Sequence, residues 1–474
     1  IQISGFSAIS ATRQVVLDMA QMFRELDDEY FAGRAADILD IGRRLMAHLG
    51  APIGPSHLDE LPPFTILLTD DLTPTDIAML PADNIAGIGL AYGTPTAHSS
   101  ILARSLGFPM VCGLGSEILS LERNLPGILD GYQGLLIVEP TAQQTDDYGA
   151  DQARDLNRQA VAVAHAHEPA RTSDGTVIPV YINANTAEEV TAMRGSGADG
   201  IGLLRTEYLF QGRAEPPSIT EQQSIYNHFA RQTDGRLLTV RALDAGGDKP
   251  VEYLMGPGEE NPFLGVRGIR LLLANPGVLT DQFHALLLAA REQPAEMVIR
   301  FMLPMISTVG ELEEARTLLE KVRGAVEEAN DGPAGARVEI GVLIEVPSAA
   351  LLAERLAAIT DFLSVGTNDL AQYVLASDRT NSRVAGMADP LHPAVLQLIA
   401  RTAYAAKIFD VPISLCGEIG GNVKAVPLLL GLGITELSVP LPAAPLVKQA
   451  VREADLFHCC LLYTSDAADD LQPV

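Results

Sequence analysis

The chain has few basic residues for its length. Its 33 Lys and Arg side chains stand against 60 Asp and Glu side chains in 474 residues, which gives a formal net charge of −27. Such an excess of negative charge argues against nucleic acid or an anionic membrane surface as a partner. An anionic small molecule can still bind wherever arginines converge locally.

Cysteines are few, and long apolar runs are missing. Cys112, Cys416, Cys459 and Cys460 are too few and too unevenly spaced for a disulfide framework or a structural zinc site. No uninterrupted apolar run approaches the roughly 20 residues that a membrane span needs. The N-terminus also lacks a basic region followed by an apolar stretch. We therefore expect a protein of the reducing cytoplasm with no membrane insertion.

The length predicts two or three domains, because one core rarely organises so long a chain. Apolar residues at helical spacing in the first 50 residues predict two or three helices packed as a hairpin. A proline-rich connection leads to a small α/β unit, and a polar, alanine-rich stretch at 141–171 predicts a helical linker. The strands expected in the small unit are 64–68, 85–90 and 134–139.

The second half of the chain alternates short apolar segments with longer helical ones. Over roughly 280 residues this alternation predicts a closed (β/α)₈ TIM-type barrel rather than an open sheet. The eight expected strands are 179–183, 201–205, 237–243, 298–305, 340–345, 362–365, 412–416 and 436–439. In such a barrel the carboxyl ends of all strands share one mouth. The polar residues at these ends are Asn183, Arg205, Arg241, Asp244, Glu345, Asn368, Asp369, Cys416 and Glu418.

Charged residues near these strand ends suggest the ligand. Forked guanidinium donors suit carboxylate and phosphate, and the candidates are Arg205, Arg241, Arg267 and Arg379. Glu345 and Asp369 offer hard oxygen ligands, which suit Mg²⁺ better than zinc. A metal bridging the carboxylate and phosphate of a small substrate would neutralise charge as a phosphoryl group leaves. Cys416 is the one thiol at the mouth, although a buried structural cysteine is an equally good interpretation.

One histidine stands out in the small α/β unit. His98 lies between small hydroxyl residues and just before an apolar helical run. We expect it to be exposed at a helix N-terminus, where backbone N–H groups can hold an anion. There it could attack a phosphoryl donor and form a phosphohistidine. The alternative is a loop histidine without chemistry.

The strings around these residues resemble a known family. Residues 93–113, GTPTAHSSILARSLGFPMVCG, are similar to the phosphohistidine motif of the phosphoenolpyruvate-utilising enzymes, although Ala97 stands where serine is usual and Tyr92 replaces a glycine. Six further strings resemble the ordered motifs of the enzyme I family, the phosphoenolpyruvate-protein phosphotransferases of the bacterial phosphotransferase system. They are IGLLRTEYLF, VRALDAGGDKP, NPFLGVRGIR, IGVLIEVPSAA, LSVGTNDLAQYVLASDR and SLCGEIGG.

The resemblance implies an activity and a set of roles. Phosphoenolpyruvate would be bound, His98 would receive its phosphoryl group, and the small carrier HPr or an HPr-like domain would accept it next. This is the first step of phosphotransferase-system sugar uptake, and it releases pyruvate. Cys416 would protonate the enolpyruvate carbon, and Glu345 with Asp369 would hold Mg²⁺. The substrate-binding residues implied are Arg205, Arg241, Asn368, Asp369 and Arg379. A homodimer joined through the barrels is also implied.

The resemblance also divides the chain into parts. The first 50 residues resemble the end of the helical HPr-docking subdomain, so we expect a chain truncated at its N-terminus. A piece of a fused multiphosphoryl transfer protein would also fit this resemblance. A swivelling phosphohistidine domain at 51–143 and a linker at 144–172 precede the barrel at 173–457. The tail at 458–474 does not resemble the family and is interpreted as an artefact of a truncated gene.

Two alternatives stay open at this point. A dikinase such as pyruvate phosphate dikinase or phosphoenolpyruvate synthase has similar histidine and barrel motifs but needs an ATP-binding domain, and the sequence contains no Walker-type glycine loop. A regulatory module of the same fold that has lost turnover is the second alternative. Retention of His98, Cys416 and the arginine and carboxylate set argues against it.

Overall fold

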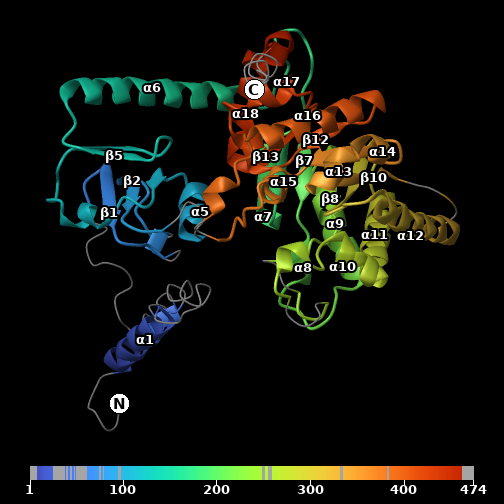
Figure 1. Ribbon diagram of the computed structural model, residues 1–474, viewed down its shortest axis with the longest axis horizontal. Helices are drawn as coiled ribbons and strands as arrows, with labels where there is room; N and C mark the ends of the chain where they lie inside the picture. Colours follow the sequence, from blue (N-terminus) through green and yellow to red (C-terminus); the bar gives the residue numbers. More distant parts are fainter. Residues whose placement is uncertain are drawn as a thin grey trace, which may run out of the picture. The chain divides into compact units, whose positions relative to one another are not determined.

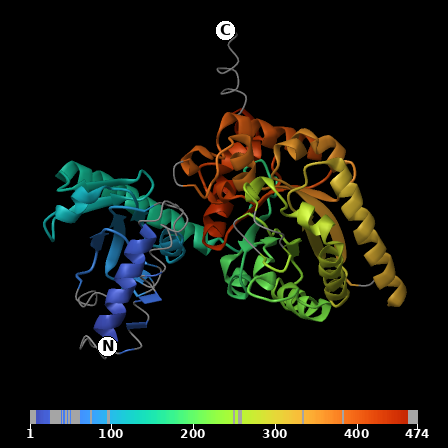
Figure 2. The same cartoon turned by 60° about the horizontal axis from the view of Figure 1, so that its bottom comes forward.

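The computed structural model describes most of the chain in two compact units, Ile1–Arg154 and Asp155–Val474 (Figures 1 and 2). The described residues are 8–24, 38, 41–42, 45–46, 49, 61–73, 76–77, 79–93, 98–247, 251–254, 259–330, 332, 335–381 and 384–461.

A parallel sheet of three strands organises the first unit. Its order is β1-β2-β3, with β1 at Thr65–Thr69, β2 at Ile85–Leu90 and β3 at Met110–Val111. A two-stranded antiparallel sheet is formed by β4 (Gly127–Asp130) and β5 (Leu135–Val138). Three of these strands, β1, β2 and β5, were expected from the sequence. The sequence interpretation missed β4, and β3 has only two residues, which is too short for an apolar pattern.

Helices complete the first unit. The helix α5 spans His98–Ser105 and connects β2 to β3 along the chain. A 3₁₀ turn, η2, spans Ser116–Ser120. Ile77, Ile88 and Ala103 are among the buried residues of its apolar core. The helix α1 spans Ala8–Arg24. Most of the helical hairpin expected in the first 50 residues lies outside the described residues.

A long helix, α6 (Ala142–Ala164), occupies much of the stretch expected to be a linker. The boundary between the two units falls inside it, after Arg154. Its C-terminal part belongs to the second unit, where Arg158 contacts Glu453 at 3.0 Å. The guanidinium of Arg452 donates to the carbonyls of His165 and Glu168, which holds the chain just beyond the helix.

The second unit is a closed barrel of eight parallel strands among the described residues, and this confirms the predicted fold class. Each strand pairs with its sequence neighbour, and the last strand closes the barrel by pairing with the first. The strands are β6 (Val180–Ala184), β7 (Gly200–Leu204), β8 (Leu237–Arg241), β9 (Val298–Leu303), β10 (Arg337–Ile344), β11 (Phe362–Val365), β12 (Ile413–Leu415) and β13 (Glu436–Pro440). All eight match segments expected from the sequence.

Helices surround this barrel, as Figure 2 shows. They are α7 (Ala187–Ser196), α8 (Glu207–Phe210), α9 (Ile219–Gln232), α10 (Ile269–Ala274), α11 (Pro276–Arg291), α12 (Val309–Ala329), α13 (Pro347–Leu351), α14 (Ala353–Ala357), α15 (Thr367–Val374), α16 (Pro393–Ile408), α17 (Val426–Gly431) and α18 (Ala444–Glu453), with 3₁₀ turns η3 (Pro262–Leu264), η4 (Ala385–Met387), η5 (Glu418–Gly421) and η6 (Leu441–Ala443). Capping boxes begin α7, α9 and α12, each with Ser or Thr followed three residues later by Glu. Because both side chains satisfy backbone N–H groups, local sequence fixes where these helices start.

The described part of the chain ends in a short helical segment. Residues 456–461 are helical, and the Cys459 side chain is 3% exposed, although residues from 458 onward were expected to be an unrelated tail. Residues 462–474 lie outside the described residues. Within the described part of the chain, none of the helices combines the length and the hydrophobicity that crossing a bilayer requires.

Candidate active site at the barrel mouth

The predicted site residues of the barrel gather at the carboxyl ends of its strands. Arg205 directly follows β7, Arg241 ends β8, and Glu345 directly follows β10. Asp369 lies in the first turn of α15, after β11, and Cys416 directly follows β12. Because all these ends open at one mouth, residues more than 200 positions apart in sequence share one site.

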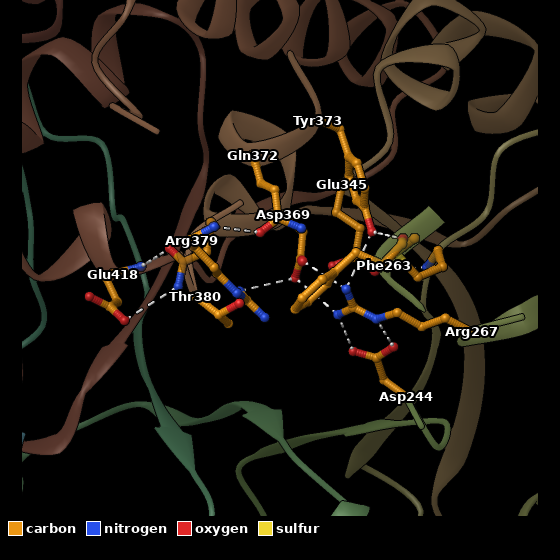
Figure 3. A network of polar contacts seen from close by, with 12 residues as sticks. Asp244, Phe263, Arg267, Glu345, Asp369, Gln372, Tyr373, Arg379, Thr380 and Glu418 are labelled. Atoms are coloured by element: carbon orange, nitrogen blue, oxygen red, sulfur yellow. Dashed lines mark hydrogen bonds and ion pairs between the residues drawn. The ribbon is translucent and has the colours of Figure 1, made fainter. Parts of the chain in front are cut away.

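Arg267 donates five hydrogen bonds to other residues of this mouth and is fully buried (Figure 3). Its Nε and Nη2 donate to the two oxygens of Asp244 at 3.1 and 3.0 Å. Its Nη1 and Nη2 donate to the two oxygens of Asp369 at 3.0 and 3.3 Å, and Nη1 also reaches the Tyr373 hydroxyl at 3.3 Å. All three guanidinium nitrogens are therefore bonded to the chain itself. Its role as a substrate ligand stays a prediction, while these contacts give it the further task of holding Asp369.

A second buried arginine, Arg241, is held by two carboxylates, Glu207 at the start of α8 and Asp244 in the loop after β8. Its Nη2 donates to Glu207 Oε1, and its Nη1 lies 3.3 Å from Asp244 Oδ2. Asp244 is fully buried and therefore links Arg241 to Arg267. Paired charges of this kind offset the cost of removing each ion from water.

Glu345 is buried beside these charges. Its Oε1 accepts a hydrogen bond from the backbone N–H of Met305 at 2.7 Å. Burial, reinforced by the negative charges of Asp369 and Asp244, raises the pKa of Glu345 to about 8. For Asp369, burial alone would raise the pKa, but the guanidinium groups of Arg267 and Arg379 outweigh it and hold the pKa below its usual value. The two carboxylates therefore differ in the ease with which they lose a proton.

The rim of the mouth is formed by more exposed residues. Asn368 exchanges hydrogen bonds with Glu418: its Nδ2 donates to Glu418 Oε1 at 3.4 Å, and its Oδ1 accepts from the Glu418 backbone N–H at 3.2 Å. Arg379 is partly exposed, and its Nη1 lies 3.4 Å from Asp369 Oδ2. Arg205 donates from Nη1 to Asn185 Oδ1 at 3.0 Å. Within the described residues, the buried Nε atoms of Arg205 and Arg241 have no hydrogen-bond partner.

Cys416 is buried just below this rim. Its neighbour Gly417 packs so closely on Thr367 that an added Cβ would lie 1.7 Å from the threonine Oγ1, so only glycine fits there. Burial raises the pKa of the Cys416 thiol, while a hydrogen bond from Ser364 acts in the opposite direction. The thiol therefore stays protonated near neutral pH, as a proton donor must.

The donor set of the mouth fits a hard divalent cation. Glu345 and Asp369 offer carboxylate oxygens, and the mutual repulsion that helps to raise the pKa of Glu345 would be relieved by a cation. Among the described residues, no cluster of three or more His, Cys, Asp or Glu side chains is placed to hold a metal. The remaining ligands would have to come from substrate oxygens and water, as is usual for Mg²⁺.

His98 belongs to the other unit of the chain. It is the first residue of α5, which agrees with its expected place at a helix start. Its side chain and residues 94–97 lie outside what the structure describes. The hydroxyl of Ser100, two residues further along the helix, lies 3.4 Å from the Cys112 thiol and ties α5 to the end of β3.

The sequence interpretation missed the carboxylates that hold the arginines. Asp244 was noted only as a polar residue at a strand end, and Glu207 was given no role. The signal was available: buried arginines need counter-charges, and both carboxylates stand within three residues of a predicted site arginine. Tyr373, which donates to the carbonyl of Phe263 at 2.6 Å, could not be found in this way.

Two protein-family models match parts of this chain. The family model described as "PEP-utilising enzyme, PEP-binding domain" matches residues 159–456, well over half of the chain. The chain belongs to the PEP-utilising enzymes. A second model of the family, "PEP-utilising enzyme, mobile domain", matches residues 61–134.

Several curated relatives of this PEP-utilising enzyme carry related names. A multiphosphoryl transfer protein of Rhodobacter capsulatus is 41% identical over 95% of this chain and 53% of its own length. A phosphoenolpyruvate-protein phosphotransferase of Geobacillus stearothermophilus is 37% identical over 96% of this chain and 78% of its own length. A phosphoenolpyruvate-protein phosphotransferase of Haloferax volcanii is 38% identical over 98% of this chain and 79% of its own length. The chain therefore spans about half the length of the multiphosphoryl transfer protein and over three quarters of the two phosphotransferases.

Proposed function

We propose that the chain transfers the phosphoryl group of phosphoenolpyruvate to His98 and then to HPr or an HPr-like domain, releasing pyruvate. This would be the first step of phosphotransferase-system sugar uptake. The observation that carries the proposal is that Arg205, Arg241, Glu345 and Cys416 all lie at the carboxyl ends of barrel strands and so share one mouth. Anion-binding guanidinium groups and a protonated thiol in one mouth suit a substrate that is anionic and needs a proton on carbon.

Substrate binding is assigned to the donors of this mouth. The buried Nε atoms of Arg205 and Arg241 have donor capacity that no described residue uses, which suits the carboxylate and phosphate of phosphoenolpyruvate. At the rim, Asn368 and Arg379 are two further predicted substrate-binding residues. Arg267 and Asp369 complete this predicted set. Relatives named phosphoenolpyruvate-protein phosphotransferase support this choice of substrate.

The chemistry follows from the residues present. A ring nitrogen of His98 bonds to phosphorus while the bond from phosphorus to the enol oxygen breaks, and that electron pair stays with the enolate. The enolate then forms the carbonyl of pyruvate as its C3 takes the proton of Cys416, which leaves a thiolate. Mg²⁺, held by Glu345 and Asp369, would supply positive charge next to the substrate carboxylate and phosphate.

The test is to charge the chain with phosphoenolpyruvate labelled in its phosphoryl group. We expect an acid-labile label on the protein that is absent from His98→Ala. The matched control His167→Ala, at an exposed histidine beyond α6, should be labelled like wild type. A chase with HPr should move the label to HPr. Label retained in His98→Ala would contradict the proposed acceptor.

Assembly and location belong to the same proposal. We propose a homodimer joined through the barrels, as the resemblance to enzyme I implies. Light scattering at tens of micromolar should give twice the mass of one chain, and a monomer there would contradict the proposal. Cys112, Cys416 and Cys459 are free thiols, which supports a reducing compartment such as the cytoplasm.

A further inference from the structure

A short chain of hydroxyl groups leads to the Cys416 thiol inside the barrel. Ser364 of β11 and Ser414 of β12 are opposite each other in the register of the two strands. The Ser414 hydroxyl donates to Ser364 Oγ at 2.8 Å, and the Ser364 hydroxyl donates to Cys416 Sγ at 3.4 Å. Ser364 is fully buried and Ser414 is 4% exposed. Two adjacent strands therefore deliver one ordered hydrogen bond to the sulfur.

The direction of these hydrogen bonds is set by the partners. Because Ser364 Oγ accepts a hydrogen bond from the Ser414 hydroxyl, the Ser364 hydroxyl hydrogen can point at the sulfur. The thiol in turn is placed to donate to the Val365 carbonyl, at 3.6 Å. Cys416 packs in a buried apolar layer with Leu203, Met302, Leu343 and Phe362. In such surroundings one hydrogen bond to a charged sulfur has a large effect.

We propose that Ser364, oriented by Ser414, is a positioning residue of the reaction that stabilises the Cys416 thiolate left when the thiol protonates the enolate. The S–H bond breaks, its proton and the π electrons of the enolate form the new C3–H bond, and the S–H electron pair stays on sulfur. The negative sulfur then accepts the Ser364 hydrogen bond more strongly than the neutral thiol did. This rests on the proposed function of Cys416.

The other groups that face the thiol act at longer range. Glu345 raises the pKa of Cys416, whereas Arg241 and Arg205 lower it through their charges. Within the described residues, the Ser364 hydroxyl is the one donor that makes a hydrogen bond to the sulfur. Removing it should therefore change the thiolate specifically and leave the anion-binding arginines in place.

The first measurement titrates the thiol by its ultraviolet thiolate absorbance in the full chain, with Cys416→Ala as the subtracted reference. In Ser364→Ala the midpoint of the Cys416 titration should rise by about one pH unit, since the thiolate loses its hydrogen-bond donor. Ser414→Ala should move it in the same direction by less. The matched control is Ser438→Ala, at a buried barrel serine whose hydroxyl donates to Asn183 Oδ1 at 2.7 Å rather than to sulfur. It should leave the titration unchanged.

The second measurement follows a single turnover by rapid quench. In Ser364→Ala, pyruvate formation should fall about tenfold while labelling of His98 keeps the wild-type rate. An unchanged titration in Ser364→Ala, or an equal shift in Ser438→Ala, would overturn the proposal. If Ser364→Ala does not fold, the same criteria apply to Ser414→Ala.

These outcomes separate this inference from the proposed function. Wild-type pyruvate formation by Cys416→Ala would overturn the acid assigned there and the catalytic part of this inference with it. Slow pyruvate formation by Cys416→Ala, together with a wild-type titration of the thiol in Ser364→Ala, would overturn this inference alone.

Discussion

Arg267 holds Asp369 by both carboxylate oxygens, from Nη1 to Oδ1 at 3.0 Å and from Nη2 to Oδ2 at 3.3 Å. The same guanidinium holds Asp244 on its other side, so one buried cation sits between two buried carboxylates. Asp369 is one of the two carboxylates predicted to bind metal. Its position therefore depends on an arginine that comes from a different loop of the barrel.

Removing this arginine should destabilise the barrel strongly. Arg267→Met leaves Asp244 and Asp369 buried without their shared counter-charge, and we expect a loss of about 3–5 kcal/mol in the free energy of unfolding. Adding Asp244→Asn should recover part of that loss, because it removes a buried negative charge that repels Asp369 and Glu345 once Arg267 is gone. Urea unfolding of the single and double variants measures both effects.

The control for this cycle is an exposed ion pair. Arg231 and Glu292 lie 3.0 Å apart with side chains 67% and 42% exposed. Arg231→Met should cost less than about 1 kcal/mol, because water already solvates both charges. Equal losses for Arg231→Met and Arg267→Met would show that burial of the Arg267 network contributes nothing.

The raised pKa of Glu345 predicts a pH dependence of the metal-free protein. The folded-state pKa is about 8 against a reference of 4.5, so between these values the folded chain binds more protons than the unfolded chain. The contribution of Glu345 to stability is therefore present at low pH and is lost as the pH rises through about 8.

Glu345→Gln should remove this loss, since the amide stays neutral at every pH. With divalent cations chelated, the thermal midpoint of the variant should fall less than that of wild type between pH 5 and 8.5. Glu296→Gln, at an exposed carboxylate, is the control and should follow wild type. Parallel curves for wild type and Glu345→Gln would contradict the prediction.

Binding of metal and substrate should be linked through Asp369. In wild type, calorimetry should find tighter binding of phosphoenolpyruvate with Mg²⁺ than without it. Asp369→Asn should bind with similar affinity in both conditions, because the amide no longer supplies a charge to the cation. Asp410→Asn, just before the amino end of β12 and away from the mouth, should keep the wild-type difference. Equal affinity of wild type for phosphoenolpyruvate with and without Mg²⁺ would refute the linkage.

The thiol should matter for product formation and not for binding. Cys416→Ala should bind phosphoenolpyruvate with near wild-type affinity and release pyruvate at least about 10²-fold more slowly, which is the usual size of a lost general acid. A coupled assay of pyruvate together with calorimetry measures the two quantities. Cys460→Ala, at an exposed thiol, is the control. Pyruvate release at the wild-type rate would assign the proton to another group.

The sequence by itself determined the order and approximate bounds of the barrel strands. Strands and helices have different hydrophobic periods, and residues such as Thr308 and Glu311 mark helix starts over four positions. The placing of Glu345 and Cys416 at strand ends followed from the same local pattern. The short strand β3 could not be predicted from this pattern, because two residues are too few to show a hydrophobic period.

Only the tertiary structure decided which of these residues bond to one another. Arg267 meets Asp369 across 102 positions of sequence, and Ser364 meets Cys416 across 52. The proton on Glu345 is likewise decided by burial and by charges on other loops. Such contacts exist only once the barrel has closed and brought distant strand ends within a few ångströms, so no local pattern of residues encodes them.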